Sequence, residues 1–258
     1  MTFLKIRDAS DEALRAGIIR TSLKMNLLGI NAGKSGNVSA RISSSPGQGG
    51  TTTRVAPGRD AGRTRAPAPT QEVHDNPAFL ITPTGIAYED TRPGQIVAMR
   101  MDGTHDGDIL PSSEWRFHRD IYAARSDVNA IVHTHARYAT TLACMDRDIP
   151  PFHYMVAAAG GKDIRCAPYA TFGTQELSDA AVAALHGRRA CLLSHHGMIA
   201  CGPSLEMALA LAVEVETLAQ MYWQALQIGE PAPLSDAEMA IVLEKFMTYG
   251  QQADSPSV

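Results

Sequence analysis

The chain has 258 residues, enough for one large domain or two small ones with a sizeable hydrophobic core. Lysine and arginine number 23 against 27 aspartates and glutamates, and the net charge of −4 excludes a protein that coats nucleic acid by neutralising phosphates. With 45% hydrophobic and 19% charged residues, the composition is that of a folded globular protein.

The four cysteines include no C-x-x-C pair, so we expect reduced thiols and neither a zinc ribbon nor a disulfide framework. The N-terminal residues 1–17 mix acidic and basic side chains without a continuous apolar run, so we expect no secretory signal and a cytoplasmic location. Only residues 205–226 approach the length of a membrane span, and Glu206, Glu214 and Glu216 within them favour a buried helix of a soluble protein.

The chain opens with a predicted amphipathic helix. Apolar residues recur at three- and four-residue steps over residues 11–27, and Gly29 follows where a helix would end. Alternating apolar residues then predict a short strand at 38–42, and the run at 79–81 predicts its hairpin partner.

Residues 43–78, between these strands, have an unusual composition. They contain five glycines and five prolines, with Val55 and Val73 as their only large aliphatic side chains. Such a segment buries too little apolar surface to offset the entropy of ordering, so we expect a flexible insertion, and a flexible tail at 251–258. Four arginines in the insertion favour a solvated loop over a nucleic-acid contact, because acidic residues accompany them and no aromatic residues lie between them.

Helices and strands alternate in the rest of the chain. We expect helices at 112–122, at 138–145 and from Ser204, and strands at 130–135 and 191–193, the second ending at residues 195–197. Ser235 followed by Glu238 has the spacing of a capping box and predicts a last helix. This order predicts an α/β fold.

Histidines follow two of the apolar runs. Alternate residues of a strand share one face, so His133 and His135 present two imidazoles side by side, and His196 follows the run at 191–193. Together with the carboxylate of Glu114 they match the ligand types of a zinc site. Histidines of an ordinary core and a carboxylate at a helix N-terminus remain the alternative, and His195 is either a structural neighbour or a catalytic group.

Three turns rich in glycine or hydroxyl groups offer bare backbone N–H groups to an anion: residues 33–37, 82–85 and 112–113. The first is followed by a strand, so it matches neither the Walker pattern nor the dinucleotide fingerprint. Each turn is an ordinary feature alone, but together they could surround one small phosphate.

Seven segments, taken together, resemble the class II aldolase and adducin-head family. The resemblance covers nearly the whole chain apart from the insertion and the two tails. The segments are GNVS at 36–39, ITPTG at 81–85, PSSEWRFH at 111–118, HTH at 133–135, YMVAAAGG at 154–161, APYATFG at 167–173 and HHG at 195–197.

The resemblance implies a single domain over residues 1–258, with a central, mainly antiparallel sheet covered by helices on both faces. It implies that one zinc ion per subunit is held by His133, His135, His196 and Glu114. It further implies that substrate phosphate is bound by Gly36, Asn37, Thr84, Gly85, Ser112 and Ser113.

Three aromatic residues receive roles from the same resemblance. Tyr154 would act as acid or base in the site of a neighbouring subunit, Tyr249 would close over the substrate, and Phe172 would line the aldehyde pocket. A homotetramer with active sites between subunits is implied as well. Lys34 departs from the family pattern, which has a small hydroxyl residue there, and this leaves the anionic substrate open.

The implied activity is reversible cleavage of a ketose 1-phosphate, such as L-fuculose 1-phosphate, to dihydroxyacetone phosphate and a short aldehyde such as L-lactaldehyde. Glu114 would leave the metal on substrate binding and exchange a proton as acid or base. A pentulose-phosphate 4-epimerase and a sugar-acid phosphate decarboxylase of the same family are the enzymatic alternatives. An adducin-like interaction domain is the non-enzymatic one.

Overall fold

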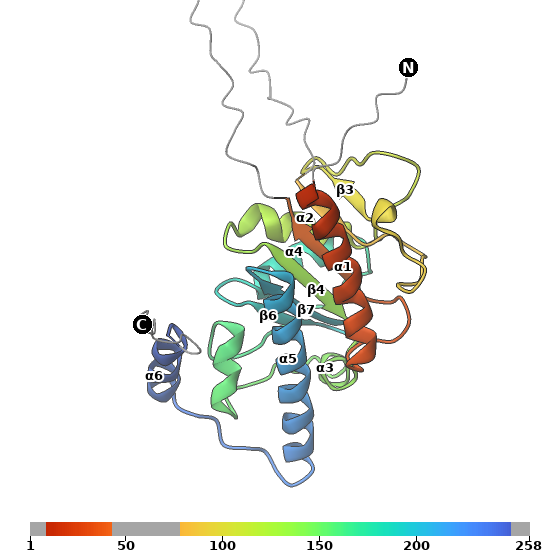
Figure 1. Cartoon of the computed structure of the whole chain (residues 1–258). Helices are drawn as coiled ribbons and strands as arrows, with labels where there is room; N and C mark the ends of the chain where they lie inside the picture. Colours follow the sequence, from red (N-terminus) through yellow and green to blue (C-terminus); the bar gives the residue numbers. More distant parts are fainter. Residues whose placement is uncertain (1–8, 43–77, 249–258) are drawn as a thin grey trace, which may run out of the picture.

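A computed structural model describes residues 9–42 and 78–248 of the chain. Within them the strands form one seven-stranded sheet in the order β3-β2-β1-β4-β7-β6-β5, in which only β5 and β6 run parallel (Figure 1). The strands are β1 (Asn37–Arg41), β2 (Phe79–Ile81), β3 (Val97–Met99), β4 (Ala130–Thr134), β5 (Cys166–Ala167), β6 (Ala190–Leu193) and β7 (Gly197–Gly202). The expected α/β fold with a mainly antiparallel sheet is therefore confirmed.

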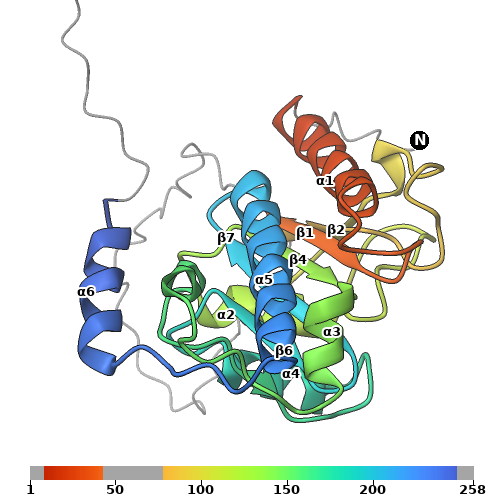
Figure 2. The ribbon, with the colours of Figure 1, turned by 90° about the horizontal axis from the view of Figure 1, so that it is seen from below.

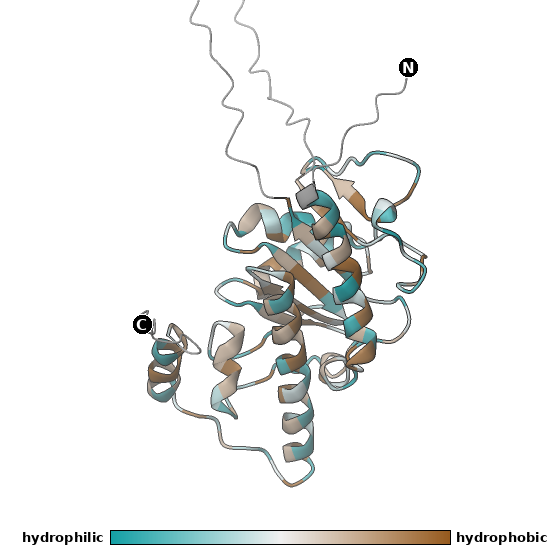
Figure 3. Ribbon diagram, in the orientation of Figure 1, coloured by the Kyte–Doolittle hydropathy of each residue, from teal (hydrophilic) through white to brown (hydrophobic). Residues whose placement is uncertain are grey.

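Helices cover both faces of the sheet (Figures 1 and 2). Successive side chains of a strand point to opposite faces, so in β4 Ile131 lies in one hydrophobic core and Val132 in the other. The core of Val132 is closed by α1 (Ala9–Leu27), α3 (Arg137–Ala143) and α5 (Leu205–Leu226), and that of Ile131 by α2 (Trp115–Ala124) and α4 (Gln175–Ala184). The hydrophobic colour of Figure 3 accordingly concentrates on the strands.

The C-terminal part of the described chain lies away from the sheet. The 3₁₀ segment η2 (Tyr154–Ala159) lies between α5 and α6 (Asp236–Phe246), so α6 is the outermost helix (Figure 1). A further 3₁₀ turn, η1 (Pro93–Gln95), precedes β3. No helix in the described ranges combines the length and the apolar character that crossing a bilayer requires.

The register of the central strands positions the site. Asn37 at the start of β1 is opposite His133 near the end of β4, and β4 pairs antiparallel with β7, which begins at Gly197. The end of β4, the start of β1 and the turn between β6 and β7 therefore meet at one edge of the sheet.

Most predicted elements are present with shifted ends. The hairpin at 38–42 and 79–81 is confirmed by β1 and β2, with Ser39 opposite Ile81. The helix expected from Ser204 begins at Leu205 with Ser204 as its N-cap, and Ser235 is confirmed as the cap of α6. The helix expected from 112 starts at Trp115, because Ser112 Oγ accepts from Glu114 N and leaves Glu114 as the N-cap residue. The predicted insertion, apart from Ala78, and the predicted tail lie outside the described residues.

Candidate metal centre

Three imidazoles converge at this edge of the sheet. His133 lies on β4, His135 directly follows that strand, and His196 lies in the tight turn between β6 and β7. The Nε2 atoms of His133 and His135 are 3.2 Å apart, and one nitrogen from each of the three rings lies within 4.8 Å of the others. The strand alternation that predicted His133 and His135 and the apolar run before His196 therefore place all three side chains at one site.

Hydrogen bonding fixes which nitrogen of His133 faces its neighbours. The carbonyl of Met198 only accepts, so Nδ1–H donates to it at 2.9 Å, and Nε2 faces the other two rings. Burial and the neighbouring imidazoles lower the pKa values of His135 and His196 to about 4. At neutral pH these rings are therefore uncharged, the form in which imidazole binds a metal.

Glu114 completes the cluster from the N-cap of α2. Its Oε2 lies 3.1 Å from His133 Nε2, and its Oε1 lies 3.2 Å from His196 Nε2. Burial raises the pKa of this carboxyl group, but its interactions with His133 and His196 and a hydrogen bond from Asn37 outweigh burial and lower it to about 2. The site therefore holds a buried anion at neutral pH.

This donor set fits a divalent cation. Glu114 Oε1 is buried and has no hydrogen-bond partner among the described residues, and His196 Nε2 lies 3.2 Å from it. Buried polar atoms are rarely left without a partner, and a cation between them satisfies all of these atoms at once. Three imidazoles and one carboxylate are ligands that zinc commonly takes.

A cavity of about 320 Å³ opens beside the cluster. Ser113 and Glu114 line one side of it, and an aromatic wall of Tyr169 and Phe172 lines another. Both aromatic side chains are largely exposed to the cavity and to solvent. The cavity therefore joins acid–base and metal-binding groups to an apolar surface.

The loops expected to bind phosphate lie around the same site. The loops of Thr82 and Ser112 are joined by a 2.9 Å bond from Ser112 N to Thr82 O, and Ser35 lines the cavity next to Gly36. Lys34 Nζ donates to Gly85 O at 2.6 Å, which places an ammonium group between the first two glycine turns. The structure thus gathers the three turns, whereas their role in phosphate binding stays a prediction.

Tyr154, one of the two expected tyrosines, is not brought to the triad within one chain. Tyr154 lies in η2 and lines a separate cavity against α6, with Phe152 and Ile241. Tyr249 lies outside the described residues. The expectation that Tyr154 serves a neighbouring subunit is compatible with this placement, since half of its surface is exposed.

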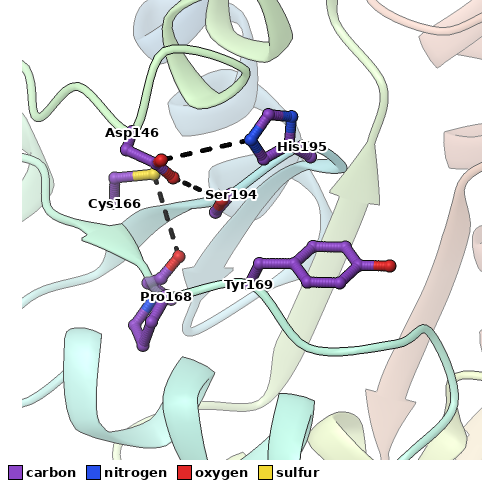
Figure 4. A pocket seen from close by; sticks show the side chains of 7 residues that line it. Asp146, Cys166, Pro168, Tyr169, Ser194 and His195 are labelled. Carbon is purple, nitrogen blue, oxygen red and sulfur yellow. Dashed lines mark hydrogen bonds and ion pairs between the residues drawn. The ribbon is translucent and has the colours of Figure 1, made fainter.

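His195 lies beside Asp146 and is not one of the three clustered histidines. Figure 4 shows its ring directed toward Asp146, and Nε2 lies 4.0 Å from Asp146 Oδ2. His195 and Tyr169 line both the cavity beside the triad and a second cavity with Ser194 and Cys166. Of the adjacent histidines His195 and His196, only His196 belongs to the cluster.

Comparisons with known proteins agree with the site. Residues 16–223 match the family described as Class II Aldolase and Adducin N-terminal domain. A 5-methylthioribulose-1-phosphate/5-deoxyribulose-1-phosphate aldolase of Rhodospirillum rubrum is 50% identical over 245 residues, 95% of this chain and 96% of the relative. An L-fuculose phosphate aldolase of Escherichia coli is 48% identical over 234 residues, 90% of this chain and 94% of the relative. A solved L-fuculose 1-phosphate aldolase superposes with a TM-score of 0.76 at 35% identity, over 91% of this chain and 96% of that one.

Proposed function

The chain belongs to the class II aldolase and adducin family and is a metal-dependent sugar-phosphate aldolase, and on that premise we propose that it cleaves a ketose 1-phosphate to dihydroxyacetone phosphate and a short aldehyde. L-Fuculose 1-phosphate, which yields L-lactaldehyde, is the first candidate substrate. The observation that carries the proposal is one cavity that is lined by two histidines of the cluster, His135 and His196, by Glu114 and by the aromatic wall.

The aromatic wall supports an aldehyde with an apolar end. The substrates named for the two relatives share a phosphorylated ketose end and a far end that carries a methyl or methylthio group. Tyr169, Ala170 and Phe172 would contact that far end, where each buried methylene contributes about 0.8 kcal/mol. A 5-methylthioribulose 1-phosphate is therefore the second candidate, favoured by the 50% identity to the Rhodospirillum rubrum enzyme.

His133, His135, His196 and Glu114 would hold the metal, for which we propose zinc at one ion per subunit. When bound, the cation supplies Lewis-acid stabilisation of the negative charge that develops beside the substrate carbonyl. Imidazole ligands are neutral, so they would leave the positive charge of the ion available for this stabilisation. The buried carboxylate of Glu114 lies against His133 and His196 and would therefore be close to the same ion.

The protein's own groups would move two protons. Cleavage breaks the bond between C3 and C4, leaves the electron pair on C3 and removes the proton of the C4 hydroxyl. Glu114 is placed to deliver a proton to C3, which becomes the hydroxymethyl carbon of dihydroxyacetone phosphate. We propose that Tyr154 of a neighbouring subunit accepts the C4 hydroxyl proton, in a homotetramer with sites between subunits, and that Tyr249 closes over the substrate.

The phosphate would lie among the three turns. Gly36, Asn37, Thr84, Gly85, Ser112 and Ser113 would provide amide and hydroxyl donors. Lys34 would add a positive charge, since its ammonium group lies against Gly85 O and phosphate oxygens accept from an ammonium group readily.

Product analysis tests the proposal. Zinc-loaded protein is incubated with dihydroxyacetone phosphate and, in separate reactions, L-lactaldehyde, acetaldehyde and methylthioacetaldehyde, and the sugar phosphates are identified. We expect condensation to a ketose 1-phosphate. In separate reactions a pentulose phosphate and a sugar-acid phosphate are supplied instead: inversion without release of an aldehyde would identify a 4-epimerase, and release of carbon dioxide would identify a decarboxylase. No turnover of any substrate, together with no zinc retained after excess metal is removed, would favour an adducin-like interaction domain.

A further inference from the structure

A chain of buried polar side chains runs from Glu114 into the core under α2. Asn37 Nδ2 donates to Glu114 Oε2 at 2.9 Å, and the Oδ1 atom of the same amide contacts His118 Nε2. On the other side of the ring, His118 Nδ1 lies 2.7 Å from Ser39 Oγ, which lies 2.8 Å from the hydroxyl of Tyr122. Asn37, Ser39, His118 and Tyr122 are each at most 3% exposed.

These side chains come from two elements that the fold holds against each other. Glu114, His118 and Tyr122 lie four residues apart and so share one face of α2, while Asn37 and Ser39 lie two residues apart on one face of β1. The two rows interdigitate, and each α2 group meets a β1 group. The helix spacing therefore aligns His118 and Tyr122 behind the carboxylate that faces the imidazole cluster.

The hydrogen bonds impose one order of protons on this chain. Asn37 presents its amide nitrogen to Glu114 and its oxygen to His118, and an amide oxygen only accepts, so His118 Nε2 must donate to it. His118 is fully buried, and burial lowers its pKa to about 3, so the ring is neutral and its one proton must lie on Nε2. Nδ1 then accepts from Ser39, and Ser39 accepts from Tyr122, whose phenol is kept protonated because burial raises its pKa.

We propose that His118 is a positioning residue for Glu114, acting through the amide of Asn37. By donating to Asn37 Oδ1, His118 prevents the amide from turning its oxygen toward the carboxylate. The second hydrogen of Asn37 Nδ2 remains available for a substrate oxygen. This inference rests on the proposed function, in which Glu114 transfers the proton at C3.

The contacts favour positioning over simple core filling. A buried histidine that only fills space needs no particular tautomer, whereas this ring has a specified partner on each nitrogen. Outer partners that orient a ligand typically change metal affinity or activity 10–100-fold when they are removed. A core residue without this role would change stability and leave turnover per folded site unchanged.

The experiment compares His118→Gln with His118→Leu in the zinc-loaded enzyme. The glutamine amide can place an N–H donor near the position of Nε2, whereas leucine removes the donor at similar volume. We expect His118→Leu to lower kcat about 10–100-fold with KM changed less than threefold, and His118→Gln to retain most of kcat. His186→Gln, a change at an exposed histidine, is the matched control and should leave both constants unchanged.

Two measurements do not depend on turnover. In metal-free protein labelled with ¹⁵N-histidine, His118 should carry its proton on Nε2 and His133 on Nδ1, with the His118 resonance assigned by its loss in His118→Gln. Competition with a chelator should show weaker zinc binding in His118→Leu than in His118→Gln.

A proton on Nδ1 of His118, or equal kcat and zinc affinity in the two variants, would overturn the proposal. If His118→Leu fails to fold, the tautomer of His118 in wild type and the kcat of His118→Gln still test the proposal. A large loss of kcat in His118→Gln would contradict rescue by the glutamine amide. A wild-type protein that cleaves no ketose phosphate would refute the proposed function, while the tautomer and zinc affinity would still test the positioning role.

Discussion

The buried imidazole of His118 makes folding stability depend on pH in a way that one substitution isolates. Burial lowers its pKa to about 3, whereas an exposed histidine in the unfolded chain titrates near pH 6.5. At pH 5 the unfolded state therefore binds a proton at this residue and the folded state does not. Because the unfolded state binds more protons, the free energy of unfolding must fall as pH falls below 6.5.

The size of the effect follows from the two pKa values. With 6.5 in the unfolded state and about 3 in the folded state, linkage gives a loss of about 2 kcal/mol from this residue between pH 8 and pH 5. Below pH 3, where both states are protonated, the loss from this residue levels off. His118→Gln has no titratable group at this position and lacks this part of the pH dependence.

Urea unfolding of wild type and His118→Gln at pH 8 and pH 5, with chelator present, measures the difference. We expect wild type to lose about 2 kcal/mol more than the variant, because the remaining titratable groups are common to both proteins. Equal losses in the two proteins would refute the claim that the folded state keeps His118 neutral.

Three further predictions concern the site. Glu114→Gln should keep the binding of dihydroxyacetone phosphate but slow exchange of its hydroxymethyl proton with solvent about 100-fold or more, followed by NMR in deuterium oxide; exchange at the wild-type rate would contradict the assigned role. Lys34→Thr should raise KM for a ketose 1-phosphate about tenfold with kcat changed less than threefold, and Lys34→Arg should restore much of KM; an unchanged KM in Lys34→Thr would remove Lys34 from the phosphate site. Gly197→Ala places a Cβ 2.6 Å from Thr134 O and 3.1 Å from His135 Cδ2, which should displace the neighbouring His196 and His135. Zinc affinity, measured by competition with a chelator, should therefore fall about tenfold or more. Unaltered affinity would mean that the turn holding His196 accommodates the added methyl group.

The imidazole cluster could be predicted from the sequence because the patterns that indicate it are local. The two-residue period of a strand places His133 and His135 on one face, and His196 follows an apolar run that ends at the same edge of the sheet. Glu114 was also predicted as a ligand, but the helix expected at 112–122 places it inside the helix, whereas it is the N-cap residue. That position leaves its side chain free to face the rings.

The chain behind Glu114 could not be predicted, because its partners are far apart in sequence. Asn37 and Glu114 are separated by 77 residues, and Ser39 and Tyr122 by 83. The sequence shows that Glu114, His118 and Tyr122 are spaced to share a helix face, but it does not show that Asn37 and Ser39 of β1 lie against that face. Asn37 was predicted to bind phosphate, and no pattern in the sequence indicated its contact with Glu114.

Strand β7 and helix α4 were among the elements not predicted from the sequence, for different reasons. Strand β7 continues an apolar run after a turn of only three residues, so residues 195–197 looked like the end of one strand instead of the link between two. Helix α4 is rich in alanine and has a weak apolar stripe, and its start is marked chiefly by Thr174, whose side chain accepts from Leu177 N.

X-ray absorption at the zinc edge, with metal analysis of wild type and His196→Ala, tests most directly whether the three imidazoles share one ion. The account predicts one zinc per chain in wild type, with three nitrogen ligands and oxygen ligands at about 2.0–2.2 Å, and loss of the ion in the variant. A wild-type spectrum with fewer than three imidazoles, or full zinc content in His196→Ala, would contradict it.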